Sequence, residues 1–245
     1  MNYKKLLIGL IGLPVYAGII SDIQSQAWVA TYSIGPVWTN PGYQQTLQLT
    51  PEIVKTYTAF APSNTLADGE LFLGVKKDLP YHLFAHLGIA GALTSQAGLS
   101  GQIWDDAEPE FNNYQYGYHV QHGHVALKAK VFKDVSYPIL PWISGSVGVG
   151  FNRSNSYQNQ PLISEAIKQN NFANYTQTSF TYTVGAGIQR IINTNWQVGV
   201  GYEFSDWGQS HLNPAVGQTE GTGLSLNHLY TNGLIFNITY GGYGI

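Results

Sequence analysis

Apolar and polar residues alternate in eight separate runs along this chain, each long enough to form a β-strand. The cleanest run spans residues 196–205, and its apolar face carries Trp196, Val198, Val200, Tyr202 and Phe204. Successive side chains of a strand point to opposite faces, so this period of two predicts a strand with one apolar and one polar face. The runs at 180–189 and 234–240 repeat the pattern, with Ile235 as an exception.

The connectors between these runs are alternately short and long. Short ones lie at 77–80, 133–138 and 193–195, and long polar ones lie at roughly 39–68, 95–117, 153–177 and 208–223. Transmembrane β-barrels have this asymmetry because their inner-side turns are tight and their outer-side loops are long. The sequence therefore predicts an all-β fold: an antiparallel, up-and-down, eight-stranded transmembrane β-barrel with short periplasmic turns and four long extracellular loops. An even number of strands places both ends of the barrel on one side.

The composition of the polar face indicates that it lines the lumen. In a soluble, lipocalin-like barrel the polar face meets water and should be rich in charged residues. Here it carries mostly Gly, Ser, Thr, Asn and Gln, which suit the narrow interior of eight strands. Charged residues make up only 10% of the chain, against about 25% in a typical soluble domain. We therefore expect the apolar face to contact lipid, with aromatic residues near the strand ends at the lipid interfaces.

The N-terminus has the features of a secretory signal peptide. Lys4 and Lys5 precede an apolar stretch, and small-residue cleavage sites end at Ala17 and Ala27. The stretch is shorter than the ~20 residues of a spanning helix, and Pro14 interrupts it. The sequence predicts a signal peptide over residues 1–27, cleaved after Ala27 or alternatively after Ala17, and a barrel over residues 28–245. The expected location is the outer membrane of a Gram-negative bacterium.

Net charge and cysteine content narrow the remaining classes of function. The net charge is −3 and no basic cluster is present to bind phosphates, so a nucleic-acid partner is not expected. The chain has no cysteine, which excludes disulfides and thiolate metal sites.

The residues from about Trp28 to Tyr240 resemble the small eight-stranded outer-membrane β-barrel family, which includes the outer-membrane protein A transmembrane domain and the opacity-protein-like porins. The resemblance rests on the strand count, the alternation of loop lengths and the terminal pattern of Leu234, Phe236, Ile238 and Tyr240. It implies that these four residues are the assembly signal read by the barrel-assembly machinery. Residues 241–245 follow the expected final aromatic residue, which departs from the usual form of the family.

Several charged residues and histidines fall on the polar faces of the runs. They are Glu70, Lys76, His86, His124, Lys128, Lys130 and Glu203. Because buried charges must be paired, we expect these side chains to form a polar network that fills the lumen. The alternative is a proton or ion path, which requires a continuous water column that eight strands rarely leave.

No catalytic set, cofactor site or metal site is expected. His122 and His124 share a strand face, as do His82 and His86, but two imidazoles alone do not make a metal site. Some small outer-membrane barrels modify lipid A with a His–Ser–acid set, and no histidine here has a serine two residues later. A lipid-A-modifying enzyme therefore remains the least favoured alternative.

The long loops are the remaining candidates for function. The second loop combines acidic and aromatic residues, namely Trp104, Asp105, Asp106, Glu108 and Glu110. Such a group can bind a protein or bridge divalent cations to lipopolysaccharide. Residues 45–49 and 53–60 alternate enough to extend strands beyond the membrane, and residues 163–169 are expected to form one or two helical turns. We expect a monomer with a structural or surface-interaction role, whose partners are membrane lipid, lipopolysaccharide and a host or surface protein.

Overall fold

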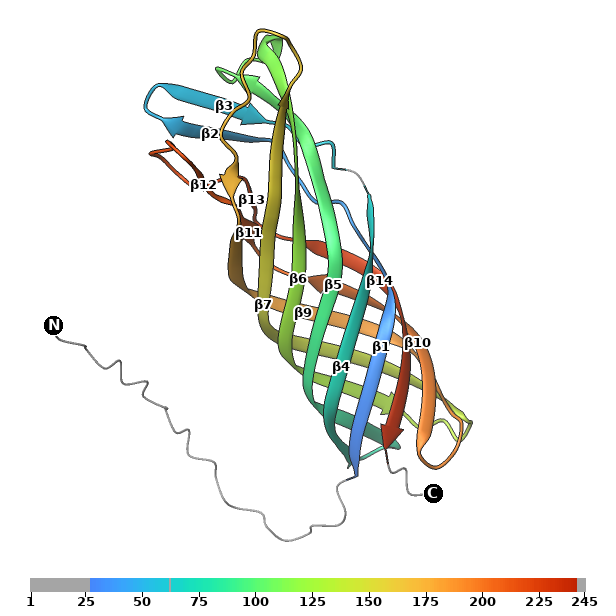
Figure 1. The fold of residues 1–245 in the computed structure, drawn as a ribbon. Coiled ribbons are helices and arrows are strands. Elements are labelled where there is room, and N and C mark those ends of the chain that lie inside the picture. The colour runs from blue at the N-terminus through green and yellow to red at the C-terminus, as the bar shows by residue number, and fades with distance from the viewer. Residues whose placement is uncertain (1–26, 62, 242–245) are drawn as a thin grey trace, which may run out of the picture.

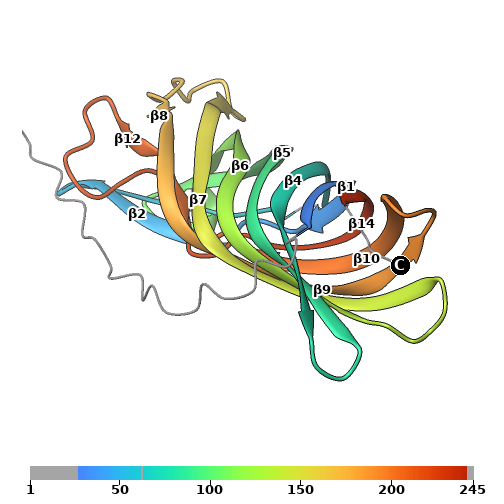
Figure 2. The same cartoon turned by 90° about the horizontal axis from the view of Figure 1, so that it is seen from below.

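A computed structural model describes residues 27–61 and 63–241, and the signal-peptide prediction for residues 1–26 lies outside this range. Eight antiparallel strands form a closed ring in the order β5–β4–β1–β14–β10–β9–β7–β6, and β6 pairs again with β5 (Figures 1 and 2). They are β1 (Trp28–Thr39), β4 (Asn64–Leu79), β5 (Leu83–Asp105), β6 (Asn112–Lys133), β7 (Ile139–Pro161), β9 (Tyr175–Ile191), β10 (Trp196–Asp206) and β14 (Tyr230–Gly241). The eight-stranded antiparallel barrel predicted from the alternation is confirmed.

The apolar faces of the strands point outward and form a continuous belt. Leu127, Ile143 and Phe180 are each more than 60% exposed, and other outward-facing apolar side chains with smaller exposed fractions continue the belt around the ring. Two groups of aromatic rings border this belt. Trp28 and Trp196 pack against Tyr240 at the end where the barrel begins and ends, and a second group at the opposite end comprises Tyr182, Phe204 and Tyr230.

The height of the belt fits a bilayer. Trp196 and Phe204 are eight residues apart on β10, which corresponds to about 26 Å along the strand at ~3.3 Å per residue. A tilt of about 40° reduces this to about 20 Å, close to the ~25 Å apolar band of known membrane barrels. No helix in the described part of the chain is long and apolar enough to cross a membrane.

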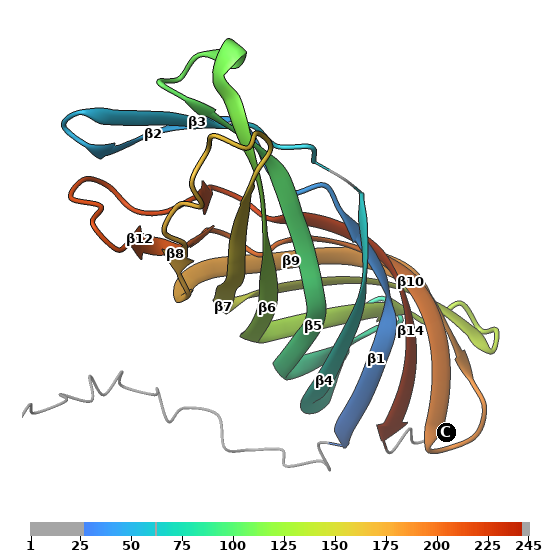
Figure 3. The ribbon, with the colours of Figure 1, turned by 45° about the horizontal axis from the view of Figure 1, so that its top comes forward.

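The strands differ greatly in length, so one wall of the barrel is much taller than the other. β5 and β7 each have 23 residues and β6 has 22, whereas β1 and β14 have 12. Figures 1 and 3 show β5, β6 and β7 rising well beyond the other strands of the ring. The last apolar outward row on this wall joins Leu93, Gly123 and Phe151. We call the part of the molecule beyond this row the crown.

Many residues that were predicted to lie in long loops therefore belong to strands. Trp104 and Asp105, expected in the second loop, form the end of β5. The expected strands in the first loop are confirmed as β2 (Gln45–Thr50) and β3 (Ile53–Tyr57), and β3 pairs with the end of β5. Shorter elements complete the crown: β8 (Phe172–Ala173), β11 (Ser210–His211), β12 (Asn213–Ala215), β13 (Ser225–Leu226) and a 3₁₀ turn, η1 (Pro109–Phe111).

The prediction of one or two helical turns at residues 163–169 is wrong, because the structure has no helix there. This segment contains a single turn, closed by a bond from Ala166 N to Ile163 O. The Asn159 side chain bonds both the amide and the carbonyl of Gln169 at 3.1 Å, and so takes up backbone groups that a helix would use. An asparagine that bonds a nearby backbone in this way competes with helix formation.

The apolar side of the tall wall changes from outward to inward at the base of the crown. On β5 the apolar residues Leu87, Ile89 and Leu93 face outward, whereas Ala97 and Leu99 are buried inside. All five have odd numbers, and the faces change because the pairing register shifts between Leu93 and Gln96. A β-bulge inserts one unpaired residue and turns the following side chains to the other face. The crown thereby gains a hydrophobic core of its own.

Candidate functional site

A cluster of aromatic and aliphatic side chains fills the lower lumen, which is the part of the barrel interior nearest the short turns. Phe84 stacks on Phe132 with ring centroids 4.7 Å apart, and Trp142 packs nearby. Ile235, the exception in the alternation of its run, points inward and completes this cluster. The exception thus reflects an apolar layer inside the barrel, and the facing of β14 is otherwise as predicted.

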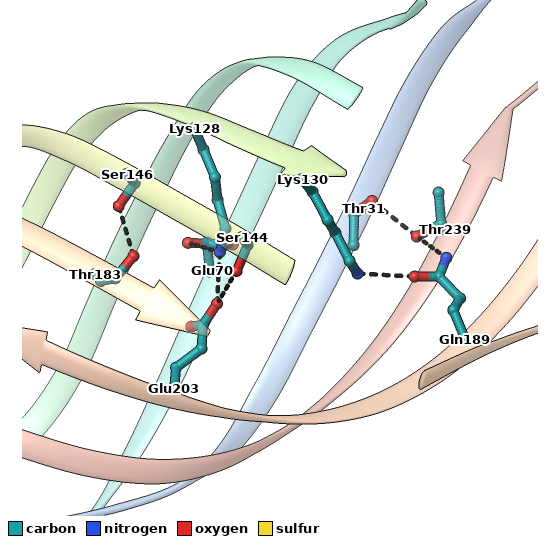
Figure 4. Close-up of polar contacts among 10 residues, drawn as sticks. All are labelled: Thr31, Glu70, Lys128, Lys130, Ser144, Ser146, Thr183, Gln189, Glu203 and Thr239. Carbon is teal, nitrogen blue, oxygen red and sulfur yellow. Dashed lines mark hydrogen bonds and ion pairs between the residues drawn. The ribbon is translucent and has the colours of Figure 1, made fainter. Parts of the chain in front are cut away.

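Above this layer, an ammonium group lies between two carboxylates. Lys128 Nζ donates to both carboxylate oxygens of Glu70 at 2.7 and 2.9 Å and to Glu203 at 3.0 Å (Figure 4). Ser144 donates to the same Glu203 oxygen at 3.4 Å. β4, β6 and β10 supply the three charges, so the ion network joins strands from different parts of the ring. Both carboxylates and the ammonium are almost fully shielded from solvent.

A second polar chain starts at Lys130, one alternation further along β6. Its ammonium donates to Gln189 Oε1 at 2.8 Å and lies 4.1 Å from the centre of the Trp142 ring. Gln189 in turn donates to Thr239 at 3.0 Å, and Thr239 shares a 2.8 Å bond with Thr31 (Figure 4). Four strands are thereby linked through neutral partners, with the cation held against an aromatic face.

The remaining lumenal residues singled out in the sequence do not join the central ion network directly. Lys76 pairs with Asp78 at 3.4 Å, close to the turn. His86 packs against the Phe132 ring at 4.6 Å. His124 bonds His122, with 2.9 Å between their ring nitrogens. The seven residues therefore occupy several levels of the lumen, and three of them form the ion network.

Sequence reasoning missed the layer that closes the top of the lumen. His122 bonds Asn152 at 2.7 Å, and the indole of Trp207 stacks on the His122 ring with centroids 4.5 Å apart and an interplanar angle of 3°. Asn152 also donates to the carbonyls of Trp207 and Gln209, each at 2.7 Å. Trp207 follows the end of β10, so no alternation signal could have placed it over a histidine of β6.

The ion network leaves little space for water between its side chains. The hollow bordered by Glu70, Lys128 and Glu203 has a volume of about 20 Å³, which is room for about one water molecule. No group of three or more metal-binding side chains occurs in the described ranges. The geometry at this level therefore favours a cross-linked lumen over a continuous water column.

The crown has a separate core rich in tyrosine. Its buried residues include Tyr57, Tyr116, Tyr118 and Tyr157, and Tyr157 packs edge-on against Phe172. Burial raises the pKa of these tyrosine hydroxyls above the ordinary value. Tyr116 donates to the carbonyl of Thr58 at 2.8 Å, which fixes the segment after β3 against the tall wall. An apolar core and such bonds make the crown an ordered body.

The acidic and aromatic residues of the second loop lie at the tip of the tall wall. Asp105 forms an ion pair with Lys55 of β3 and accepts a bond from Asn113 at 2.8 Å, so it is part of the framework. Asp106 has φ 52°, in the left-handed region, where the chain leaves β5. Asp106, Glu108 and Glu110 are exposed. The structure thus separates one structural acid from three that are open to solvent.

A histidine and an aspartate meet at the low side of the crown. His228 Nδ1 bonds Asp206 Oδ2 at 2.8 Å, and its ring stacks on Tyr230. Ser225, the serine that precedes it in the chain, bonds Gln45 instead. The His–Asp pair therefore lacks that serine as a nucleophile, and its contacts connect the end of β10 to the start of β14.

The residues of the predicted assembly signal lie on the same face of β14. Leu234, Phe236, Ile238 and Tyr240 alternate with buried neighbours, and the first three are 40–53% exposed on the lipid-facing side. The four residues thus lie on a strand that pairs with β1 to close the ring, and their role as an assembly signal stays a prediction.

No protein-family model matches the chain. No curated protein matches it either. Solved structures that are similar to this chain include Neisserial surface protein A (9% identity; 87% of this chain and 96% of that one; TM-score 0.41). Others are the outer-membrane protease OmpT of Escherichia coli (8%; 91% and 98%; 0.43) and the N-terminal β-barrel domain of Pseudomonas aeruginosa OprF (13%; 88% and 98%; 0.34). These identities are too low to transfer the role of any residue, so this chain's site must be judged by its own geometry.

Proposed function

We propose that this chain is a non-conducting barrel of the bacterial outer membrane whose crown contacts partners outside the cell. The observation that carries the proposal is the contrast between the two halves of the molecule. The lumen within the lipid belt is closed by side chains, whereas the sheet beyond the belt continues as an ordered body with exposed walls and an acidic tip.

The closed lumen argues against a pore. An ion-selective path needs a continuous water column lined by charge. In this barrel the charges bond one another, with Lys128 donating to Glu70 and Glu203. The aromatic layer lies below them and the Trp207–His122 stack lies above. These contacts support a structural role for the lumen, which is to cross-link the strands.

The crown is suited to surface interaction because its tip is both ordered and charged. The Lys55–Asp105 pair and the β3–β5 pairing hold the tip in place. Preorganised surfaces bind with a smaller loss of conformational entropy than flexible loops do. The exposed carboxylates of Asp106, Glu108 and Glu110 would meet a partner with basic groups, or divalent cations bridged to lipopolysaccharide. The chain would act as a monomer, inserted by the barrel-assembly machinery.

Two measurements test the proposal. The first is single-channel recording of residues 28–245 folded into planar bilayers, with heat-modifiable gel mobility to confirm the barrel. Folded protein should give silent bilayers, and discrete conductance steps would contradict the closed lumen.

The second measurement is the adherence of cells displaying the protein to cultured epithelial cells. Changing Asp106→Asn, Glu108→Gln and Glu110→Gln together removes the tip charges with little change in size, and adherence should fall. Glu52→Gln with Glu220→Gln is the matched control, since both are exposed crown acids outside the tip segment: Glu52 lies in the turn between β2 and β3, and Glu220 N bonds Leu49 O of β2. Unchanged adherence of the tip variant, or an equal loss in the control, would contradict a role for the tip.

A further inference from the structure

The outward face of the tall wall carries neutral polar side chains in rows that cross three strands. Strand pairing fixes these rows, because directly paired residues of neighbouring strands point to the same side. Two adjacent rows follow from the register: Gln102, Gln115 and Gln160 in one, and Ser100, Gly117 and Gln158 in the next. Gln115 donates to Gln160 at 3.3 Å, so the amides of neighbouring strands are within reach of one another.

A hollow of about 620 Å³ lies in this face. Its middle strand contributes Gly117, whose missing side chain leaves the floor open. A Cβ added there would first meet the Leu99 carbonyl oxygen at 3.5 Å, an ordinary contact distance. Phe60 borders the hollow, is 58% exposed, and belongs to the segment that bonds the edge of β5 through Ser100. His119 borders it from the row nearer the membrane.

The chemistry of this hollow matches a neutral sugar. Among the residues that the structure describes, its lining includes no lysine, arginine, aspartate or glutamate. Each glutamine amide offers two donors and an acceptor oxygen, which complements hydroxyl groups that both donate and accept. An exposed aromatic ring such as Phe60 supplies an apolar surface for the C–H face of a pyranose. Small-molecule sites typically combine apolar surface with a few placed polar groups in this way.

The direction of the hollow indicates where its ligand comes from. The wall faces sideways, and its polar rows lead down to the row of Leu93, Gly123 and Phe151, where the lipid belt begins. A ligand in the hollow would therefore lie beside the barrel, just outside the outer leaflet of the membrane. A molecule anchored in that leaflet is held there at high effective concentration, as a linked binding partner is.

We propose that this hollow binds neutral sugar units of a glycolipid anchored in the outer leaflet beside the barrel. The inference rests on the proposed outer-membrane placement, but it concerns the side wall and not the acidic tip. It assigns the crown a second contact, one that joins the protein to the surrounding glycolipid layer.

The test uses the folded barrel in nanodiscs that contain lipopolysaccharide with a complete core oligosaccharide, with native mass spectrometry to count retained glycolipid. Gln115→Ala with Gln158→Ala removes two amides from the hollow, and Gly117→Leu fills its floor while keeping them. Gln209→Ala is the matched control, an exposed glutamine outside the hollow. Heat-modifiable mobility confirms that each variant is folded.

Gln115→Ala with Gln158→Ala should retain the core-bearing glycolipid about tenfold more weakly than the parent, as the loss of two hydrogen bonds of ordinary strength implies. Gly117→Leu should also retain it more weakly, because the leucine side chain fills the floor of the hollow. The control should match the parent. Lipopolysaccharide truncated before its neutral sugars should bind parent and variants alike.

Retention by the hollow variants equal to that of the parent would overturn the inference. So would equally strong binding of the free core oligosaccharide, which would make the hollow a site for soluble sugar. The tip variant separates this inference from the proposed function, since it should lose cell adherence while retaining glycolipid. Loss of glycolipid binding in the tip variant would contradict two separate sites.

Discussion

Replacing Lys128 with methionine tests whether the lumen depends on charge compensation. Methionine preserves the unbranched apolar part of the side chain and removes the ammonium, which makes three bonds of 2.7–3.0 Å to Glu70 and Glu203. Lys128 and Glu70 are each only 7% exposed, so solvent cannot replace the lost bonds. The change leaves two carboxylates facing each other in a space of about 20 Å³.

The expected loss follows from these contacts. Hydrogen bonds to charged groups contribute about 1.5–3 kcal/mol each, and removing the ammonium also removes the cost of burying it. Breaking a buried ion network by deleting one partner typically leaves a net loss of about 3–5 kcal/mol. This corresponds to roughly 10²–10⁴-fold in the folding equilibrium constant, at ~1.4 kcal/mol per tenfold change.

Urea unfolding in lipid vesicles, followed by tryptophan fluorescence, measures this free energy. A triple variant, Lys128→Met with Glu70→Gln and Glu203→Gln, removes all three charges and should recover most of the loss, because neutral replacement of a whole buried network is often tolerated. A loss below about 1 kcal/mol in the single variant would refute the reasoning, since buried unpaired charge costs more than that. An equal loss in the triple variant would show that Lys128 acts through packing and not through charge.

Leu127→Arg should cost about 2–4 kcal/mol of membrane-folded stability, because Leu127 is 67% exposed within the lipid belt. Gln115→Arg on the same face of β6, but in the crown, should cost little; equal losses in vesicle unfolding would contradict the facing and the belt boundary. Raised pH should loosen the crown before the barrel, because burial raises the pKa of Tyr116 and Tyr118. Their folded-state pKa lies above the unfolded one, so their contribution is complete below about pH 10 and is lost as the pH rises above it. Near-ultraviolet circular dichroism should change above that pH while heat-modifiable mobility persists, and unchanged dichroism with ionised tyrosines would contradict the buried cluster.

The barrel and its facing could be predicted from sequence because a half-buried strand needs a period of two, and β10 keeps it without exception. The crown could not be placed as easily. On β6 the apolar residues change from odd positions, such as Leu127, to even positions, such as Tyr116 and Tyr118, and this change marks the base of the crown. On β5 the apolar positions stay odd, and only the register shift after Leu93 turns them inward. A bulge of this kind is decided by pairing between strands, which a single chain does not display.

The sequence predicted which residue types line the lumen, but it did not predict which side chains bond one another. Charges on the lumenal face must pair, yet the sequence does not say that Lys128 bonds both glutamates while Lys130 bonds a glutamine. Lumenal glycines give a further example. A Cβ at Gly201 would lie 2.3 Å from the Trp142 ring, so this glycine is a packing position for an aromatic side chain of another strand. Such fits depend on the closed ring, and they appear only once the strand order is known.

The central claim is that the crown faces the outside of the cell while the short turns face the periplasm. The chain has no cysteine, so single cysteines can be introduced at Glu108, in the crown, and at Thr194, in the turn between β9 and β10. Labelling of intact cells with a membrane-impermeant maleimide is the most direct test. The cysteine at position 108 should be labelled on intact cells, and the one at position 194 only after the outer membrane is permeabilised. Labelling of position 194 but not of position 108 on intact cells would contradict the account.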